Sequence, residues 1–116
     1  MKFKLIVVMV ADEKTDTVID AARTAGATGC TVVTSARGEG LNPPKTFLGL
    51  TLEWQRDVIL MLVEGHMSRQ ILEVIAERGR LDEEPGTGVA FEIDIEDVIG
   101  LASQMETIER EIEDEI

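Results

Sequence analysis

The chain nearly repeats itself when it is aligned with itself at an offset of 53 residues. The apolar residues 7–10 fall on the apolar residues 60–63, and Gly26 falls on Gly79. When the offset is increased by six residues, residues 28–30 align with residues 87–89. The pattern of each half therefore predicts a strand, a helix that ends at a glycine, a loop and a second strand. A doubled unit of this size is compatible with few architectures.

Alternating and β-branched apolar residues predict four strands, and the first and third are the most apolar. A doubled strand–helix–strand unit predicts an α+β, ferredoxin-like fold, in which two split β-α-β halves share one antiparallel sheet with two helices on one face. This fold hosts many unrelated activities, so it does not name a function. The predicted strands cover residues 2–10, 30–37, 54–64 and 89–95.

Two helices are predicted between the strands. Asp12 or Thr15 caps the first helix, which Gly26 stops, and Ser68 caps the second helix, which ends at Gly79. A single helical turn is predicted over residues 96–100. Residues 1–101 form one domain in this interpretation, and residues 102–116 form an acidic tail. The tail is predicted to be an amphipathic helix, because its apolar residues are spaced four, three and four apart at Leu101, Met105, Ile108 and Ile112.

Composition excludes several classes of protein. The chain has 11 basic and 23 acidic residues, and this net charge of −12 argues against binding to nucleic acid. Its longest apolar run, residues 5–11, is far too short to span a bilayer, and we expect a cytoplasmic protein without direct membrane insertion. One cysteine, Cys30, and one histidine, His66, leave no plausible zinc set, so no metal is expected to be required.

Two loops break the internal symmetry, and they are the candidate functional regions. Residues 38–53 form a long link, and residues 80–85 are an insertion in the second half. Both regions border a glycine pair, Gly38 with Gly40 and Gly86 with Gly88, and such pairs let backbone N–H groups approach an anion. Arg37 precedes the first pair, so the two loops together predict a phosphate site, although glycine pairs also simply make turns.

Catalytic groups are not apparent, and we expect that the protein is not an enzyme. No serine or cysteine has a histidine at a suggestive spacing. His66 is predicted to be a solvated histidine, and Cys30, at the start of a strand, is predicted to be a buried structural thiol.

Over residues 1–101 the chain resembles the PII family of signalling proteins. The resemblance is carried by residues 25–32 (AGATGCTV), by Arg37-Gly38-Glu39-Gly40, and by residues 85–88 (PGTG) leading into residues 91–94. It implies a homotrimer that binds adenine nucleotides in clefts between subunits. It also implies that the loop after the second strand, the T-loop, docks on a protein target, with a membrane transporter expected first, in nitrogen or carbon regulation.

The resemblance also implies roles for individual residues. Gly29 and Thr31 would meet the adenine. Arg37, Gly38 and Gly40 would form the base of the T-loop beside the phosphates. Backbone N–H groups would come from the opposite loop, namely from Gly86, Thr87 and Gly88.

Departures from the family pattern favour a nucleotide with few phosphates. In nitrogen-sensing members a lysine follows the second glycine turn, where this chain has Val89, and two arginines occupy the positions of Gly100 and Ala102. An arginine and a glutamine are replaced by Leu41 and Asn42. Because each lost charge-assisted contact is worth roughly 1.5–3 kcal/mol, we expect ADP, AMP or a cyclic nucleotide, with one or two phosphates, rather than ATP. The chain has no tyrosine, which excludes control by uridylylation of the loop.

Two other functions stay open at this point. A structural or metal-responsive trimer, similar to the copper-tolerance (CutA-like) family of the same fold, would use Asp82, Glu83 and Glu84 as ligands. A small ferredoxin-like enzyme acting on a carbonyl substrate would need a carboxylate with a shifted pKa in an apolar pocket.

Overall fold

The structure is a computed structural model that describes residues 2–37, 46–47, 50–51, 56–84 and 86–101. The first half comprises strand β1 (Phe3–Ala11), a short 3-10 turn (Asp12–Lys14), helix α1 (Thr15–Thr24) and strand β2 (Thr31–Ala36). The second half comprises strand β5 (Arg56–Glu64), helix α2 (Gly65–Gly79) and strand β6 (Gly88–Ile95). Between the halves, β3 (Thr46–Phe47) and β4 (Leu50–Thr51) pair as a short antiparallel two-stranded sheet.

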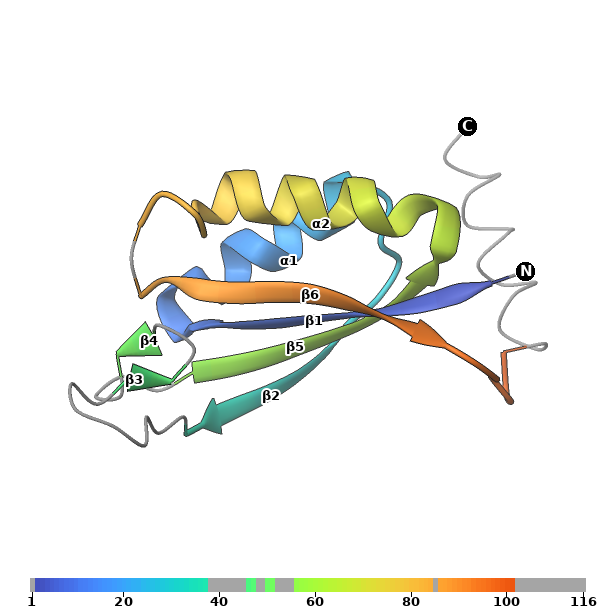
Figure 1. The fold of residues 1–116 in the computed structure, drawn as a ribbon, viewed down its shortest axis with the longest axis horizontal. Helices are drawn as coiled ribbons and strands as arrows, with labels where there is room; N and C mark the ends of the chain where they lie inside the picture. The colour runs from blue at the N-terminus through green and yellow to red at the C-terminus, as the bar shows by residue number, and fades with distance from the viewer. Residues whose placement is uncertain (1, 38–45, 48–49, 52–55, 85, 102–116) are drawn as a thin grey trace.

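The four long strands form one antiparallel sheet in the order β2-β5-β1-β6. Helices α1 and α2 cover one face of this sheet (Figure 1). The two halves of the repeat interlock, because β1 of the first half lies between β5 and β6 of the second half. This arrangement confirms the predicted α+β, ferredoxin-like double β-α-β fold.

The core lies between the sheet and the two helices. Side chains alternate along a strand, so every second residue of β1 and β5 points toward the helices. Those of β1 are Ile6, Val8 and Val10, and each is fully buried. The other fully or nearly fully buried side chains of this cluster are Ile59, Met61, Val63, Val18, Ala22, Ile71 and Ile75.

The opposite face of the sheet, which we call the open face, is also apolar. The register pairs Leu5 with both Leu62 and Ile93, and paired residues of neighbouring strands point to the same face. Several of these side chains are substantially exposed, with 46% of Ile93 and 36% of Phe91 accessible to solvent. No helix of the described residues covers this face, so its apolar side chains have no cover within that part of the protomer (Figure 1).

Helix α2 begins earlier than predicted. It starts at Gly65 rather than after Ser68, and the Gly65 N–H donates to the carbonyl of Lys2 at 2.8 Å. The Ser68 hydroxyl is therefore inside the first turn, where it donates to the carbonyl of Gly65 at 3.1 Å. The predicted cap at Ser68 is wrong because a backbone group distant in sequence satisfies the start of the helix.

Other local predictions had mixed outcomes. Neither Asp12 nor Thr15 caps α1 with its side chain: the helix begins at Thr15, whose hydroxyl donates to Asp57 at 2.6 Å. Gly26 follows α1 with φ of 114°, as a stop-glycine should. After α2, which ends at Gly79 as predicted, the left-handed residue is Arg80, with φ of 56°.

Two further predictions are wrong. Residues 96–100 form no helical turn, and Ile99 is 98% exposed there. Cys30 is exposed rather than buried, because it precedes the edge strand β2 and lies outside the core. The predicted tail helix over residues 102–116, and most of the long link over residues 38–53, lie outside the described residues.

Candidate functional site

Arg37 and the turn at residues 86–88 lie at the same end of the sheet but at opposite edges. Ala36 of β2 pairs with Arg56, which pairs with Ala11, and the Ala11 N–H donates to the carbonyl of Thr87 at 3.1 Å. Arg37 and the turn at residues 86–88 therefore lie at the two ends of one row of paired residues that crosses all four strands. At ordinary strand spacing, the two edge strands are about 14 Å apart. One protomer does not bring them together, so the predicted phosphate site, which we call the cradle, would need a second protomer.

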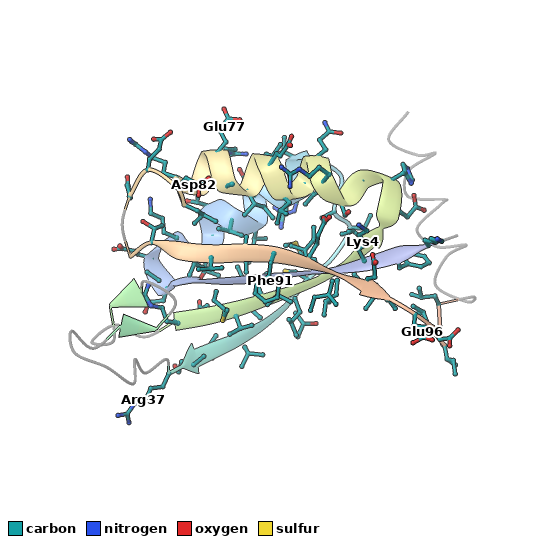
Figure 2. All side chains as sticks on the ribbon, viewed as in Figure 1. Lys4, Arg37, Glu77, Asp82, Phe91 and Glu96 are labelled. Atoms are coloured by element: carbon teal, nitrogen blue, oxygen red, sulfur yellow. The ribbon has the colours of Figure 1, made fainter. Side chains whose placement is uncertain are left out.

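Arg37 follows the last residue of β2 and is exposed. Its side chain points away from the sheet (Figure 2), so the guanidinium is accessible to a molecule outside the protomer. Gly38 and Gly40, the other predicted residues of this turn, lie outside the described residues.

The second turn divides the roles of its three residues. Thr87 is only 7% exposed, its hydroxyl donates to the carbonyl of Glu84 at 2.7 Å, and its N–H donates to the same carbonyl at 3.3 Å. Both donors of Thr87 are thus used inside the turn. Gly86 has φ of 78°, which favours glycine. An anion contact of Thr87 would therefore compete with its hydrogen bonds to Glu84, whereas the contacts of Gly86 and Gly88 stay predictions.

Gly88 also has a packing role. A Cβ atom at this position would lie 2.6 Å from the carbonyl oxygen of Met9 and 2.5 Å from Cγ1 of Val10. β6 can approach β1 this closely only because residue 88 has no side chain. The glycine is therefore explained by packing whether or not a ligand binds beside it.

Gly29 and Thr31 lie toward the other end of β2. Gly29 lines a hollow of about 140 Å³ together with Arg23 and Cys30, and a Cβ atom at Gly29 would meet nothing within 4 Å. Thr31 is exposed and pairs with Leu60 near the middle of β5. A second, mostly apolar hollow of about 90 Å³ shares Ala27 and Thr28 with the first, and its other lining residues are Phe3, Gly26, Leu62, Val63, Glu64, Met67, Ile71 and Leu101.

Arg56 was not among the predicted site residues. It is only 4% exposed, and it lies between Ala36 and Ala11 in the row of paired residues that joins Arg37 to the turn at residues 86–88. Burial lowers the pKa of its guanidinium, and the nearby charges of Asp12 and Glu13 oppose that shift. Strand alternation directs Arg56 to the open face, since the adjacent Asp57 bonds to Thr15 on the helix side. The only signal in the sequence was its position near the start of the predicted strand 54–64, after the long link.

The two alternative functions gain no support from the described residues. In that part of the chain no group of three or more histidine, cysteine or carboxylate side chains could hold a metal ion. Glu83 and Glu84 pair instead with Arg80, at 3.2 and 3.4 Å. Asp57 is buried, but Thr15 hydrogen-bonds to it and it lines neither hollow beside β2. None of the helices described is both long and apolar enough to cross a membrane.

Solved structures with the same fold include three from two bacterial proteins. The apo form of CPII from Thiomonas intermedia K12, a nitrogen regulatory PII-like protein, is 19% identical, with a TM-score of 0.65 over 82% of this chain and 90% of that chain. A putative PII-like signalling protein from Thermus thermophilus is 18% identical, with a TM-score of 0.60 over 82% of this chain and 87% of that one. CPII bound to ADP, AMP and acetate is 17% identical, with a TM-score of 0.60 over 83% and 90%.

A search of curated protein sequences gave no significant match. The family model of the nitrogen regulatory protein P-II, in contrast, matches residues 3–105, which is nearly the whole chain. This match agrees with the interlocked sheet and with the resemblance of residues 1–101. The chain belongs to the P-II family of signalling proteins, as a divergent, PII-like member.

Proposed function

We propose that this chain is a cytoplasmic, non-enzymatic sensor of adenine nucleotides that acts as a homotrimer. ADP or AMP binds in the cleft between two protomers, in preference to ATP. Nucleotide binding changes the order of the T-loop (residues 38–53), and this change controls the binding of a partner protein. The favoured partner is a membrane transporter in nitrogen or carbon metabolism.

One observation carries the proposal. Arg37 and the turn at residues 86–88 lie at the same level of the sheet but on opposite edges. In a closed ring of protomers, one edge of each protomer can face the other edge of its neighbour. The exposed guanidinium of one protomer would then meet the N–H groups of Gly86 and Gly88 of the next, which suits a phosphate group.

The choice of nucleotide is supported by charge and by a relative. The described part of the proposed site contributes Arg37 as an exposed cation, and Val89 follows the glycine turn where a lysine occurs in nitrogen-sensing members. Fewer cations suit fewer phosphates. CPII from Thiomonas intermedia K12, which has this fold, has been solved with ADP and AMP.

The open face supports the trimer. Leu62, Phe91 and Ile93 are large apolar residues that remain at least a third exposed in the protomer. Burying such a face against other copies is favourable by roughly 25 cal/mol for each Å² of apolar area. Phe91→Asp should therefore yield monomers in analytical ultracentrifugation, whereas Ile99→Asp, a charge on a side chain that lies off the sheet, should leave trimers. A trimeric Phe91→Asp protein would contradict this assembly.

The nucleotide proposal is tested by titration calorimetry with ATP, ADP, AMP and cyclic nucleotides. We expect ADP or AMP to bind most tightly. Arg37→Ala should weaken ADP binding about 10- to 100-fold, which corresponds to one lost charge-assisted contact. Arg69→Ala is the matched control, since Arg69 is an exposed arginine of α2 that pairs with Glu73. If no adenine nucleotide binds the wild type, nucleotide sensing is refuted.

A mixing experiment tests whether the cradle crosses the protomer boundary. Gly86→Asp places a repelling carboxylate in the turn, and Gly86→Asn is its uncharged control, since both residues tolerate the left-handed conformation. Trimers refolded from equal amounts of Arg37→Ala and Gly86→Asp chains should regain wild-type affinity at about one site in four. If both groups belonged to the same protomer, mixing would restore no sites.

Hydrogen exchange tests whether nucleotide binding changes the order of the T-loop. Amide exchange over residues 38–55 should differ between the ADP-bound and nucleotide-free trimer, and Arg37→Ala should abolish the difference at an ADP concentration that saturates the wild type. Unchanged exchange in the ADP-bound wild type would leave nucleotide binding intact but would reject the T-loop as its readout.

A further inference from the structure

A groove of about 550 Å³ runs between α2 and the edge strand β6. It exists because the residues of β6 that point toward the helix at this place, Gly88 and Ala90, are small. Leu72 and Ala76 of α2 and Leu81 of the following turn supply apolar surface. The groove is on the helix-covered side of the sheet, so it is separate from the open face that we assign to trimer contacts.

The floor of this groove includes an unpaired strand edge. Among the described residues, β6 pairs with β1 and with no other strand. The hydrogen bond from the Ala11 N–H to the carbonyl of Thr87 fixes which residues of β6 direct their backbone groups toward β1. Because hydrogen-bonded and non-bonded pairs alternate in an antiparallel ladder, Gly88, Ala90 and Glu92 direct their backbone N–H and carbonyl groups outward.

The rim of the groove is acidic. Glu73, Glu77, Asp82 and Glu83 line it together with a single arginine, Arg69. Arg69 pairs with Glu73 at 2.9 Å, and Arg80 pairs with Glu83 at 3.2 Å. Glu77 and Asp82, which extend from the end of α2 and from the next turn (Figure 2), have no ion pair within the described part of the chain. The groove thus offers two carboxylates that no basic side chain of that part neutralises.

We propose that this groove binds an extended, lysine- or arginine-bearing segment of a partner protein, which adds to the sheet as a strand beside β6. Strand addition to a free edge flanked by a helix supplies main-chain hydrogen bonds, and the flanking side chains select the sequence. The strand edge shares Gly88 with the proposed nucleotide cradle, but it continues along β6 at Ala90 and Glu92, and its test requires no nucleotide.

The geometry favours a segment in which basic and apolar residues alternate. Side chains on the helix-facing side of an added strand would point at Leu72, Ala76 and the carboxylates of α2. Lysine and arginine suit this surface, because their methylene stems pack on apolar groups while their charged ends reach the rim. Side chains on the other side would continue the apolar open face beside Val89 and Phe91. An acidic segment would meet like charges along the whole rim.

Fluorescence anisotropy with short labelled peptides of alternating lysine and valine tests the proposal. The peptide should bind the wild-type protein, and binding should weaken as salt is added. A peptide of alternating glutamate and valine should not bind. A lysine–valine peptide that is N-methylated on alternate residues keeps its charge but cannot pair with a strand edge, and it should also fail to bind. In hydrogen exchange, the unmodified peptide should protect the amide of Ala90.

Two double variants, each of which replaces two carboxylates by lysines, show whether peptide binding depends on the groove. The Glu77→Lys/Asp82→Lys protein should bind the peptide about tenfold more weakly, or worse. The Asp16→Lys/Asp97→Lys protein, with the same change in net charge on exposed residues outside the groove, should bind as the wild type does. Equal losses in both variants, equal binding of the N-methylated peptide, or no binding to the wild type would each overturn the proposal. The N-methylated comparison uses only wild-type protein, so it holds even if a variant fails to fold.

Discussion

The two edges of the sheet come from equivalent positions of the internal repeat, yet they differ in regularity. β6 pairs with β1 without interruption, from Phe3 opposite Ile95 to Val10 opposite Gly88. β2 pairs with β5 over a shorter stretch, and its register shifts between Val33 and Ala36. At that shift Ser35 adopts φ of 58°, which is unusual for a residue with a side chain.

The loops that lead into the two edges differ in the same direction. The turn before β6 is closed by its own hydrogen bonds, from the N–H groups of Glu83 and Glu84 to the carbonyl of Arg80, and from Thr87 to Glu84. The segment before β2 also has backbone hydrogen bonds, from the Gly26 N–H to the carbonyl of Arg23 and from the Ala27 N–H to the carbonyl of Ala22, but it leaves space around Gly29. The β6 edge is therefore the more regular of the two edges, and the β2 edge has the more open surroundings.

The largest expected difference between the two edges is in the free energy of unfolding when a glycine at each edge gains a side chain. Gly88→Val should lower the free energy of unfolding by about 3 kcal/mol, because its side chain would overlap the carbonyl of Met9 and the side chain of Val10. Gly29→Val should change it by less than about 0.5 kcal/mol, because nothing lies near its Cβ position. Urea denaturation of each variant measures both values.

Ligand binding should separate a packing role from a binding role at Gly29, when the variant is compared with the wild type at equal concentrations of folded protein. Gly29→Val should weaken ADP binding if residue 29 meets the adenine, whereas its stability stays near that of the wild type. Similar stability losses at the two glycines would show that the edges do not differ as the packing indicates.

A second comparison concerns how each half of the repeat is attached to the sheet. Helix α2 starts with a backbone bond from Gly65 to Lys2, whereas α1 starts with the side-chain bond from Thr15 to the buried Asp57. Thr15→Val should cost about 2 kcal/mol in urea denaturation, because it leaves a buried carboxylate without its donor. Thr15→Ser, which keeps the hydroxyl, should recover most of that loss. Equal stability of the valine and serine variants would mean that the bond does not stabilise α1.

The repeat and the apolar periodicity predicted every long element of the described fold, because those signals reflect which residues enter the core. They failed where a distant group decides the local structure. The start of α2 at Gly65 depends on Lys2, more than sixty positions earlier in the chain. The exposure of Cys30 depends on β2 being an edge strand, which is a property of the strand order.

The candidate site was predictable to a similar degree. The glycine pattern indicated the turn at residues 86–88, but it did not distinguish Thr87, whose donors are bound to Glu84, from the two glycines. It also did not indicate that Gly88 is required for packing against Met9. Composition gave no reason to single out Arg56, because its position between the two edges depends on the pairing of β5 with β1 and β2.

The strained residue of the β2 edge permits a test with a smaller effect. Ser35→Gly should raise the free energy of unfolding by about 0.5 kcal/mol, because glycine adopts the left-handed conformation without a steric cost. Arg80→Gly should gain less, because Arg80 also pairs with Glu83 and Glu84. Urea denaturation of both variants checks the order. A larger gain at Arg80 would indicate that its two ion pairs contribute nothing.

The smallest effect concerns the β6 edge at alkaline pH. The pKa of Lys4 is raised above its ordinary value of 10.5, first because the ammonium donates a hydrogen bond to Glu92 and then because that carboxylate attracts its charge. A pKa that is higher in the folded state stabilises the fold below pH 10.5 and ceases to do so as the pH rises through the raised value. Wild-type Tm should therefore fall more between about pH 9 and about pH 12 than the Tm of Lys4→Gln, and the absence of tyrosine leaves this range free of phenol titration. The ion pair is accessible to solvent, so the difference should shrink in high salt. An equal fall in both proteins would show that the Lys4–Glu92 pair does not stabilise β6.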